Sequence, residues 1–542
     1  MPGYYVENFG CRATQADGAA LERQFEDQGL TRATSPNQAS VVVLNTCTVT
    51  SGADQDARAA IRRVRRQNPE ARIVVTGCYA QRAPEEIAAL PGVDLVVGNS
   101  HKHQLAEIVE SLSPQLGDSG WRSASSAATN PAQLNGASAP AVPGFIPLST
   151  FVNPSGSGKP EATSPIYVSD IFAHTELLAA PVFDAANERT RPNLKIQDGC
   201  DNRCSFCVIP YVRGQSRSLE MDRIIREVNT LVHAGYREVV ISGINLGRWG
   251  RDLGVRRQAA GVRQTASSES HDAGTAALGG RAQRDASVIA ANEFRKPEAE
   301  SQAPDFLTPD ARRLTPTLPR LIRTILNETS LEKLRISSVE PMDWSDDLIA
   351  LVANSSRIAK HAHVPMQSGS DAVLRRMHRK YRPWHYREKI EKIHAAMPDA
   401  AIGADVMVGF PGETDAEFEA TRQMIEHLPF TYLHVFTYSP RPGTPAAQMK
   451  NQVPVPVARE RNRILRELAS EKKLAFMRGF IGKTVDAITL NVRGTDADGE
   501  FIECLTDNYL KLRLRGHDES NHWRTVNVQN VSAGSLIGER AV

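Results

Sequence analysis

The sequence predicts an α/β protein of three domains: an N-terminal parallel α/β domain, a partial (β/α)6 barrel and a small C-terminal all-β barrel. Three observations predict this architecture. Short apolar segments alternate with helix-like segments over residues 1–112, and the alternation resumes over residues 191–450. Over residues 475–540, apolar and polar residues alternate every second position between Gly, Asp and Asn, which is typical of short antiparallel strands.

The N-terminal domain has four strand-like segments joined by amphipathic segments, which predicts a parallel sheet with crossover helices. The expected strands are 4–9, 40–46, 72–77 and 94–98, and the expected helices are 16–29, 53–67, 83–90 and 102–112. The second domain repeats a strand–helix unit six times, which fits a partial barrel that stays open where eight units would close it. Its expected strands are 193–197, 238–243, 333–338, 361–366, 401–409 and 432–438.

Two segments interrupt the pattern. Residues 113–190 are rich in Ser, Ala, Pro and Gly, and we expect a disordered linker there. A small embedded domain is the alternative. Residues 251–313, after the second barrel strand, have mixed charge and few periodic apolar positions, so we expect a disordered insertion.

Composition sets broad limits on function. The net charge of the 542-residue chain is +2, so any nucleic-acid surface must be local. We expect no signal peptide, and the apolar runs are too short to cross a membrane. We therefore expect a cytoplasmic protein whose thiols are reduced, which disfavours disulfides among its seven cysteines.

Three cysteines are clustered just after the first expected barrel strand. Cys200, Cys204 and Cys207 follow residues 193–197, at the strand end where barrel enzymes carry their active sites. Thiolates are the usual ligands of iron–sulfur clusters, and three of them leave one iron of a [4Fe–4S] cluster open. A zinc site with a fourth ligand elsewhere in the chain is the alternative.

The C-x3-C-x2-C spacing, with Phe206 before the last cysteine, resembles the signature of the radical S-adenosylmethionine (SAM) superfamily. The resemblance implies that the open iron binds SAM and that one electron then produces a 5′-deoxyadenosyl radical. Later strand ends resemble the SAM-binding stretches of the superfamily. Besides Phe206, the expected SAM contacts are Ser242, Gly243, Asn245, Ser338, Glu340, Asp405 and Gly409.

The remaining cysteines of interest are far apart in the sequence. Cys11, Cys47 and Cys78 each follow an expected strand of the N-terminal sheet. Because the carboxyl ends of parallel strands share one edge, we expect the three thiols to meet and to bind a second iron–sulfur cluster. A small buried side chain is the alternative for each cysteine taken alone.

With both sets present, the chain resembles the methylthiotransferase family of radical SAM enzymes. The segments "NTCTVT", "VVTGCYAQ", "KIQDGCDNRCSFCVIPYVRGQSRS" and "FTYSPRPGTPAAQM" carry the resemblance, and residues 475–540 resemble the RNA-binding TRAM domain. The resemblance implies two [4Fe–4S] clusters and two uses of SAM, as methyl donor and as radical source. It also implies an external electron donor, and we expect a monomer.

Three substrates are known in that family: isopentenyladenosine in tRNA, threonylcarbamoyladenosine in tRNA, and an aspartate of a ribosomal protein. The residues of the motifs most resemble those of the threonylcarbamoyladenosine type, which acts on carbon 2 of adenine 37 in the anticodon stem-loop. A metal-stabilised RNA-binding protein without catalysis is a further alternative. Expected RNA contacts are Arg58, Arg62, Arg63, Arg65 and Arg66 on one helix, with Phe501, Tyr509 and Trp523 as stacking platforms.

Overall fold

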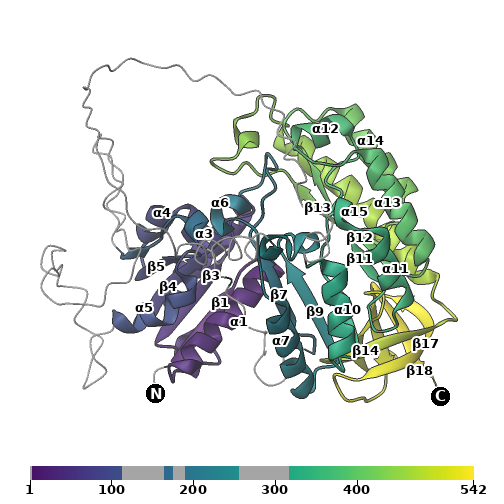
Figure 1. The fold of residues 1–542 in the computed structure, drawn as a ribbon, viewed down its shortest axis with the longest axis horizontal. Helices are drawn as coiled ribbons and strands as arrows, with labels where there is room; N and C mark the ends of the chain where they lie inside the picture. The colour runs from purple at the N-terminus through teal and green to yellow at the C-terminus, as the bar shows by residue number, and fades with distance from the viewer. Residues whose placement is uncertain (1–2, 113–163, 175–176, 178–189, 255–315, 542) are drawn as a thin grey trace, which may run out of the picture.

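The computed structural model describes residues 3–112, 164–174, 177, 190–254 and 316–541. Figure 1 shows an N-terminal α/β unit beside a larger α/β barrel, with a small β-domain at the C-terminal end of the chain. The predicted fold class is confirmed in all three parts. Most of the expected linker and of the expected insertion lies outside the described residues.

The N-terminal domain is a six-stranded sheet in the order β2-β1-β3-β4-β5-β6, with every neighbouring pair parallel. Apolar clusters cover both faces of the sheet, which explains why its central strands are uninterrupted apolar runs. The strands are β1 (Gly3–Asn8), β2 (Thr31–Arg32), β3 (Val41–Thr46), β4 (Arg72–Gly77), β5 (Leu95–Gly98) and β6 (Ile166–Tyr167). The helices are α1 (Arg12–Asp27), α2 (Ser51–Gln67), α3 (Cys78–Arg82), α4 (Pro84–Ala88) and α5 (Leu105–Ser111).

Both segments that were predicted to be disordered include residues that belong to regular structure. Ile166 and Tyr167 lie within the expected linker 113–190, yet they pair with β5 as the last strand of the sheet. Ser164 holds the chain just before β6 against the sheet, because its hydroxyl donates to the carbonyl oxygen of Val93 at 2.8 Å. Residues 251–254, the expected start of the insertion, are helical, and Leu253 is buried in the barrel core. Segments of two to four residues are too short to produce a periodic signal.

The second domain is the predicted partial barrel. Two parallel sheets, β10-β9-β7 and β11-β12-β13, are joined by single bridges between Leu334 and Ile358 and between Ser338 and His363. The short strand β8 (Arg217–Ser218), which the sequence did not predict, pairs antiparallel with β7 at the open edge. The six parallel strands are β7 (Asn193–Asp198), β9 (Glu238–Gly243), β10 (Lys333–Ile336), β11 (His361–His363), β12 (Ala401–Val408) and β13 (Tyr432–Thr437).

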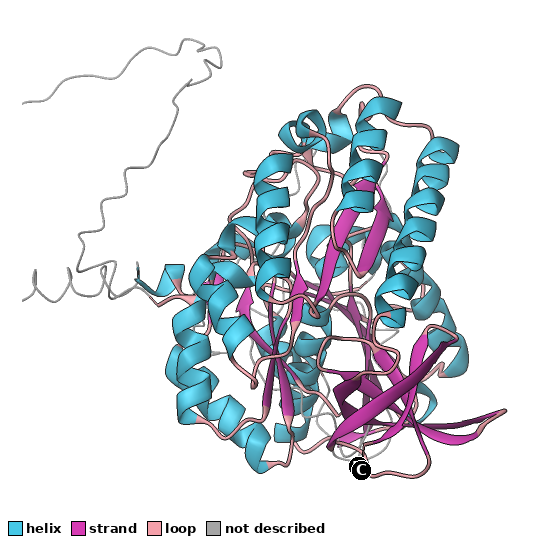
Figure 2. Cartoon of the chain, turned by 90° about the vertical axis from the view of Figure 1, so that its right-hand side faces the viewer, coloured by secondary structure: helices cyan, strands magenta, loops and turns pink. Residues whose placement is uncertain are grey.

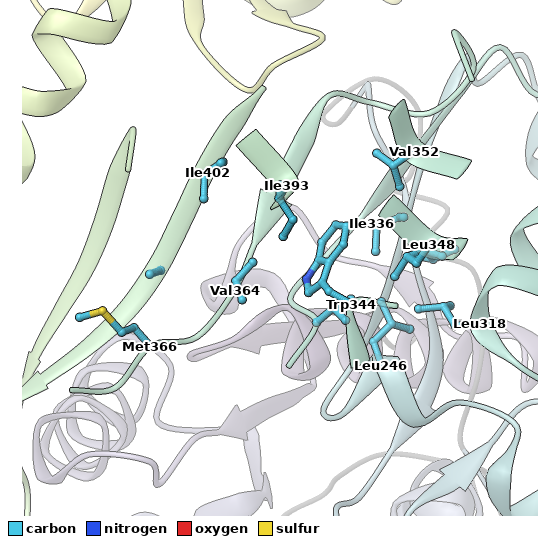
Figure 3. Close-up of a cluster of buried hydrophobic side chains, with 14 of the residues drawn as sticks. Leu246, Leu318, Ile336, Trp344, Leu348, Val352, Val364, Met366, Ile393 and Ile402 are labelled. Atoms are coloured by element: carbon cyan, nitrogen blue, oxygen red, sulfur yellow. The ribbon is translucent and has the colours of Figure 1, made fainter. Parts of the chain in front are cut away.

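Helices cover the outside of this barrel, and a continuous apolar core fills the space between strands and helices. Figure 3 shows Trp344 at the centre of that core, among side chains from strands and helices. The helices are α6 (Ile209–Arg213), α7 (Met221–His233), α10 (Leu318–Glu328), α11 (Asp346–Asn354), α12 (Asp371–Arg376), α13 (Pro383–Ala396), α14 (Asp415–His427) and α15 (Val455–Arg478). Among the described residues, no helix combines the length and apolar character needed to cross a membrane.

The C-terminal domain is a closed five-stranded barrel in the order β14-β15-β16-β18-β17. Figure 2 shows its strands packed beside the helices of the larger barrel. Cys504 lies in its apolar core at 1% exposure. The strands are β14 (Thr484–Asp496), β15 (Gly499–Thr506), β16 (Lys511–Arg515), β17 (Trp523–Ser532) and β18 (Ser535–Arg540).

Buried polar contacts hold the C-terminal domain against the larger barrel. Arg335 in β10 is fully buried, and its Nε atom donates to Glu238 at 2.6 Å. The same guanidinium donates to the carbonyl oxygens of Thr506 and Asp507 in the β15–β16 turn, at 3.3 and 3.1 Å. Because β10 and β9 begin at Lys333 and Glu238, this turn docks near the amino ends of the barrel strands.

Candidate active site

Cys200, Cys204 and Cys207 lie in the loop after β7, at the carboxyl end of that strand. Burial is the main cause that raises the pKa of Cys207 to about 12, and the charge of Cys204 adds to it. Two side chains donate to the other sulfur atoms: Asn245 Nδ2 lies 3.6 Å from Cys200 Sγ, and Arg379 Nη1 lies 3.2 Å from Cys204 Sγ. Since metal ligation requires thiolates, these donors favour the form that binds iron.

Cys11, Cys47 and Cys78 follow β1, β3 and β4, which are neighbours in the sheet. Burial raises the pKa of Cys47 to about 12, with further contributions from the charges of Cys78 and Cys11. Cys47 also lies next to the chain that leads into Cys11, because a Cβ atom on Gly10 would be 2.9 Å from Cys47 Sγ. Gly10 has a φ of +102°, and a Cβ atom there would lie 2.6 Å from Cys47 Cβ, so the chain before Cys11 needs a glycine.

Among the described residues, no group of three or more His, Cys, Asp or Glu side chains is arranged to hold a single metal ion. A zinc ion needs every ligand about 2.0–2.3 Å from one point. A [4Fe–4S] cluster takes each thiolate on a different iron, so its ligands need not converge in that way.

A cavity of about 490 Å³ connects the three domains. Cys11 and Arg12 of the N-terminal domain line it, and so does Tyr509 of the C-terminal domain. The barrel contributes the clustered cysteines Cys200, Cys204 and Cys207 together with most of the predicted SAM contacts, namely Phe206, Ser242, Gly243, Asn245, Ser338, Glu340 and Asp405. Cys47 and Cys78 do not line this cavity but lie buried beside it in the N-terminal sheet.

Gly409 is the predicted SAM contact that the structure places elsewhere, because it is absent from the cavity wall. Its φ is +73°, and a Cβ atom there would lie 2.6 Å from Ala458 Cβ in α15. Its backbone N–H donates to Glu413 at 2.7 Å. The glycine therefore serves a turn packed against a helix, and a glycine after a strand could not be assigned to a ligand from sequence alone.

The cavity wall has polar groups that suit a polar cofactor. Buried polar atoms without a hydrogen-bond partner among the described residues include Asn202 Oδ1, Ser242 Oγ, Asn245 Oδ1 and Ser337 Oγ. All four residues line the cavity, and buried polar atoms are normally paired. An amino-acid and nucleoside ligand such as SAM would satisfy them, so the residues present fit that cofactor.

The cavity wall also has a group of rings that sequence reasoning did not bring together. His361 and His363 of β11, Tyr432 and His434 of β13, and Tyr509 form a continuous set, with neighbouring ring centroids 4.6–5.9 Å apart. Burial, helped by the charge of Arg335, lowers the pKa of His361 well below its ordinary value. The signal in the sequence was spacing: His361 and His363, and likewise Tyr432 and His434, are two positions apart, so both rings of each pair lie on the same face of their strand.

A buried charge network joins the N-terminal domain to the barrel. Asp17 in α1 accepts from Lys102 at 3.1 Å, from Arg213 at 3.0 Å and from Lys195. Asp198 accepts from Lys195 at 2.9 Å and from Arg213 at 3.0 Å. Burial acts to raise the pKa of Asp17, but the three cations outweigh it and hold that pKa below its ordinary value. A lysine inside an apolar strand was the sequence signal for this network.

The predicted RNA-contacting helix is only partly available. Arg58 donates to Tyr79, Arg63 pairs with Glu7, and Arg65 pairs with Asp94. Arg62 and Arg66 remain exposed. Of the expected stacking platforms, Phe501 is buried beneath Arg513, Trp523 lies against Lys333, and Tyr509 lines the cavity.

Comparisons with known proteins found two matching family models and several similar proteins. Residues 3–98 match the uncharacterized protein family UPF0004, and residues 194–247 and 307–425 match the radical SAM superfamily. Threonylcarbamoyladenosine tRNA methylthiotransferase MtaB of Aquifex aeolicus is 30% identical, covering 95% of this chain and 97% of that relative. The protein of the same name from Bacillus subtilis is 31% identical, covering 98% and 94%. The tRNA-2-methylthio-N(6)-dimethylallyladenosine synthase of Erythrobacter litoralis is 28% identical, covering 90% and 86%.

Proposed function

Since this chain belongs to the radical SAM methylthiotransferase family, we propose that it acts on tRNA and adds a methylthio group to carbon 2 of N6-threonylcarbamoyladenosine at position 37. The names of the relatives from Aquifex aeolicus and Bacillus subtilis support this substrate. The name of the Erythrobacter litoralis relative supports isopentenyladenosine as a second candidate. Both candidates are adenosines that differ in the group on N6.

One observation carries the proposal. Cys11, from the scattered set, lines the same cavity as Cys200, Cys204 and Cys207. We propose that each set of three cysteines holds one [4Fe–4S] cluster. A substrate in this cavity would then face both centres, as a methylthio transfer to an unactivated C–H bond requires.

When bound, the clusters and SAM supply a 5′-deoxyadenosyl radical on the barrel side and a sulfur atom to be transferred on the N-terminal side. The chain's own residues position these groups. Arg379 bonds both Cys204 and Glu340, so it holds a carboxylate next to the thiolate that it stabilises. The unpartnered atoms Ser242 Oγ and Asn245 Oδ1 offer hydrogen bonds to SAM, and Phe206 packs edge-on against Phe410 beside the cluster loop.

The partner in this proposal is the anticodon stem-loop of tRNA. The exposed Arg62 and Arg66 are candidates for phosphate contacts. An external donor must supply the electron, because no side chain of the 20 standard amino acids is a reductant of that strength. We expect the protein to act as a monomer, since one chain supplies residues from all three domains to the cavity.

The test of the substrate is nucleoside mass spectrometry of tRNA from cells with and without the gene. We expect 2-methylthio-N6-threonylcarbamoyladenosine to disappear in the deletion strain. Loss of the isopentenyladenosine derivative instead would establish the second candidate. If every 2-methylthio nucleoside persisted, tRNA would not be the substrate.

Iron content tests the two-cluster arrangement. Anaerobic reconstitution should give about eight irons per chain, and about four after replacing Cys11, Cys47 and Cys78 with alanine. The triple variant should still cleave SAM, because the barrel cysteines remain. A wild-type value of about four irons would contradict a second cluster.

A further inference from the structure

Arg12 is a cation in the cavity wall without a carboxylate partner. It follows Cys11, is half-buried, and lines the cavity. Its Nη2 atom donates to the hydroxyl of Tyr509 at 3.0 Å. In the part of the chain that the structure describes, no ion pair includes Arg12, whereas its neighbours in the buried network and around the cluster loop are paired.

The carboxylates of the cavity are used elsewhere. Glu340 pairs with Arg379, and Asp405 lies 3.4 Å from His363 Nε2. A guanidinium has five N–H donors in a planar fork, and the structure assigns one of those of Arg12 to Tyr509. The free donors match the two oxygens of a carboxylate.

Tyr509 can donate a further hydrogen bond next to Arg12. Its hydroxyl oxygen accepts from Arg12, and its own proton has no acceptor among the described residues. The turn that carries Tyr509 is fixed. Asn508 Nδ2 donates to the carbonyl oxygen of Asp399 at 2.9 Å, and Arg335 donates to that of Asp507. Tyr509 itself has a φ of +69°, a conformation that surrounding contacts must hold.

We propose that Arg12 and Tyr509 together bind the carboxylate of the threonylcarbamoyl group, which distinguishes this substrate from an adenosine with an apolar N6 group. The inference rests on the proposed function. Arg12 lies next to Cys11, so a substrate held there lies beside the proposed sulfur-donating centre. Tyr432 and His361, next to Tyr509, offer ring surfaces to the rest of the nucleoside. The N-terminal and C-terminal domains therefore bind the same carboxylate together.

The experiment measures binding of fluorescent anticodon stem-loops to anaerobically reconstituted holoenzyme, without reductant. Three stem-loops carry threonylcarbamoyladenosine, its carboxylate methyl ester, or isopentenyladenosine at position 37. For Arg12→Gln we expect affinity for the first to fall about 10–100-fold, the range for a lost charged hydrogen bond. Affinity for the ester should change less than about threefold, because its charge is already absent.

Two further variants keep the test informative. Tyr509→Phe, which leaves the N-terminal domain intact, should weaken only the threonylcarbamoyl stem-loop, by about 3–10-fold. Arg323→Gln, on an exposed helix surface, is the matched control and should change none of the three. Iron content shows whether Arg12→Gln retains both clusters.

The outcomes separate the two proposals. If wild type prefers the threonylcarbamoyl stem-loop over its ester and both variants keep that preference, the roles of Arg12 and Tyr509 are wrong while the substrate stands. If wild type binds the isopentenyl stem-loop best, the proposed substrate is wrong. Equal losses for all three stem-loops in both variants would also overturn the carboxylate role.

Discussion

Replacing Asp17 with asparagine removes one of the two carboxylates from the buried network between the N-terminal domain and the barrel. Asp17 is 2% exposed and accepts hydrogen bonds from Lys102, Lys195 and Arg213. Asparagine has nearly the same shape but no charge. In the variant, Lys195 and Arg213 would keep Asp198 as a partner, while the buried Lys102 would keep only the side-chain oxygen of Asn45 among the described residues.

The expected loss in the free energy of unfolding follows from the burial of Asp17. Removing one partner of a buried ion pair typically costs about 3–5 kcal/mol, because the remaining charge is left uncompensated. For a cooperative unit of about 150–250 residues, each kcal/mol lowers the melting temperature by about 2–4 °C. We therefore expect the first thermal transition of Asp17→Asn to fall by about 6–20 °C.

The assay is differential scanning calorimetry of the holoprotein under anaerobic conditions. A multidomain chain need not unfold in two states, so the comparison uses the first transition. Asp347→Asn is the control: its partner is Arg323, and their side chains are 55% and 46% exposed, so the loss should stay below about 1 kcal/mol. If the two variants melt within about 2 °C of each other, the network does not stabilise domain docking.

Three further predictions concern single side chains. Gly403→Ala should cost about 1–3 kcal/mol and lower turnover with iron retained, because a Cβ atom there would overlap the ring of Tyr432; an unchanged melting temperature and turnover would contradict this. Cys504→Ala should leave iron content unchanged, since burial raises the pKa of this thiol to about 12 and it lies in an apolar core; loss of iron would make it a ligand. For His361, the folded-state pKa is depressed, so stability is full above pH 6.5 and falls as pH drops, by up to about 1.4 kcal/mol per pH unit. His361→Gln should therefore flatten the melting temperature between pH 6.5 and 5.5, and an unaltered slope would refute the assignment.

The strands were readable from the sequence because their apolar runs are buried on both faces, and β3 is buried at all six positions. The cysteines were readable because chain order already placed them at strand ends. β6 could not be predicted from the sequence, since two residues are too few to show an alternation of apolar and polar positions and the strand forms only by pairing with β5.

The rest of the cavity depends on contacts between distant parts of the chain. Nothing local to Tyr509 indicates that a turn of the small barrel reaches His361 and Arg12. Lys195 stands out as a lysine in an apolar strand, but nothing in the sequence places Asp17 beside it; the packing of α1 against β7 buries both side chains. Side chains that acquire their role only in tertiary contact leave at most a weak trace in a single sequence.

The bond between Arg12 and Tyr509 spans 497 positions of the chain. A ribosome releases the first partner long before it has made the second. Every translation product that stops before the β15–β16 turn would carry all six cysteines of the two sets yet lack the residue that lies against the rings at the start of β11 and β13. The cavity therefore gains its full wall only after synthesis has passed the β15–β16 turn.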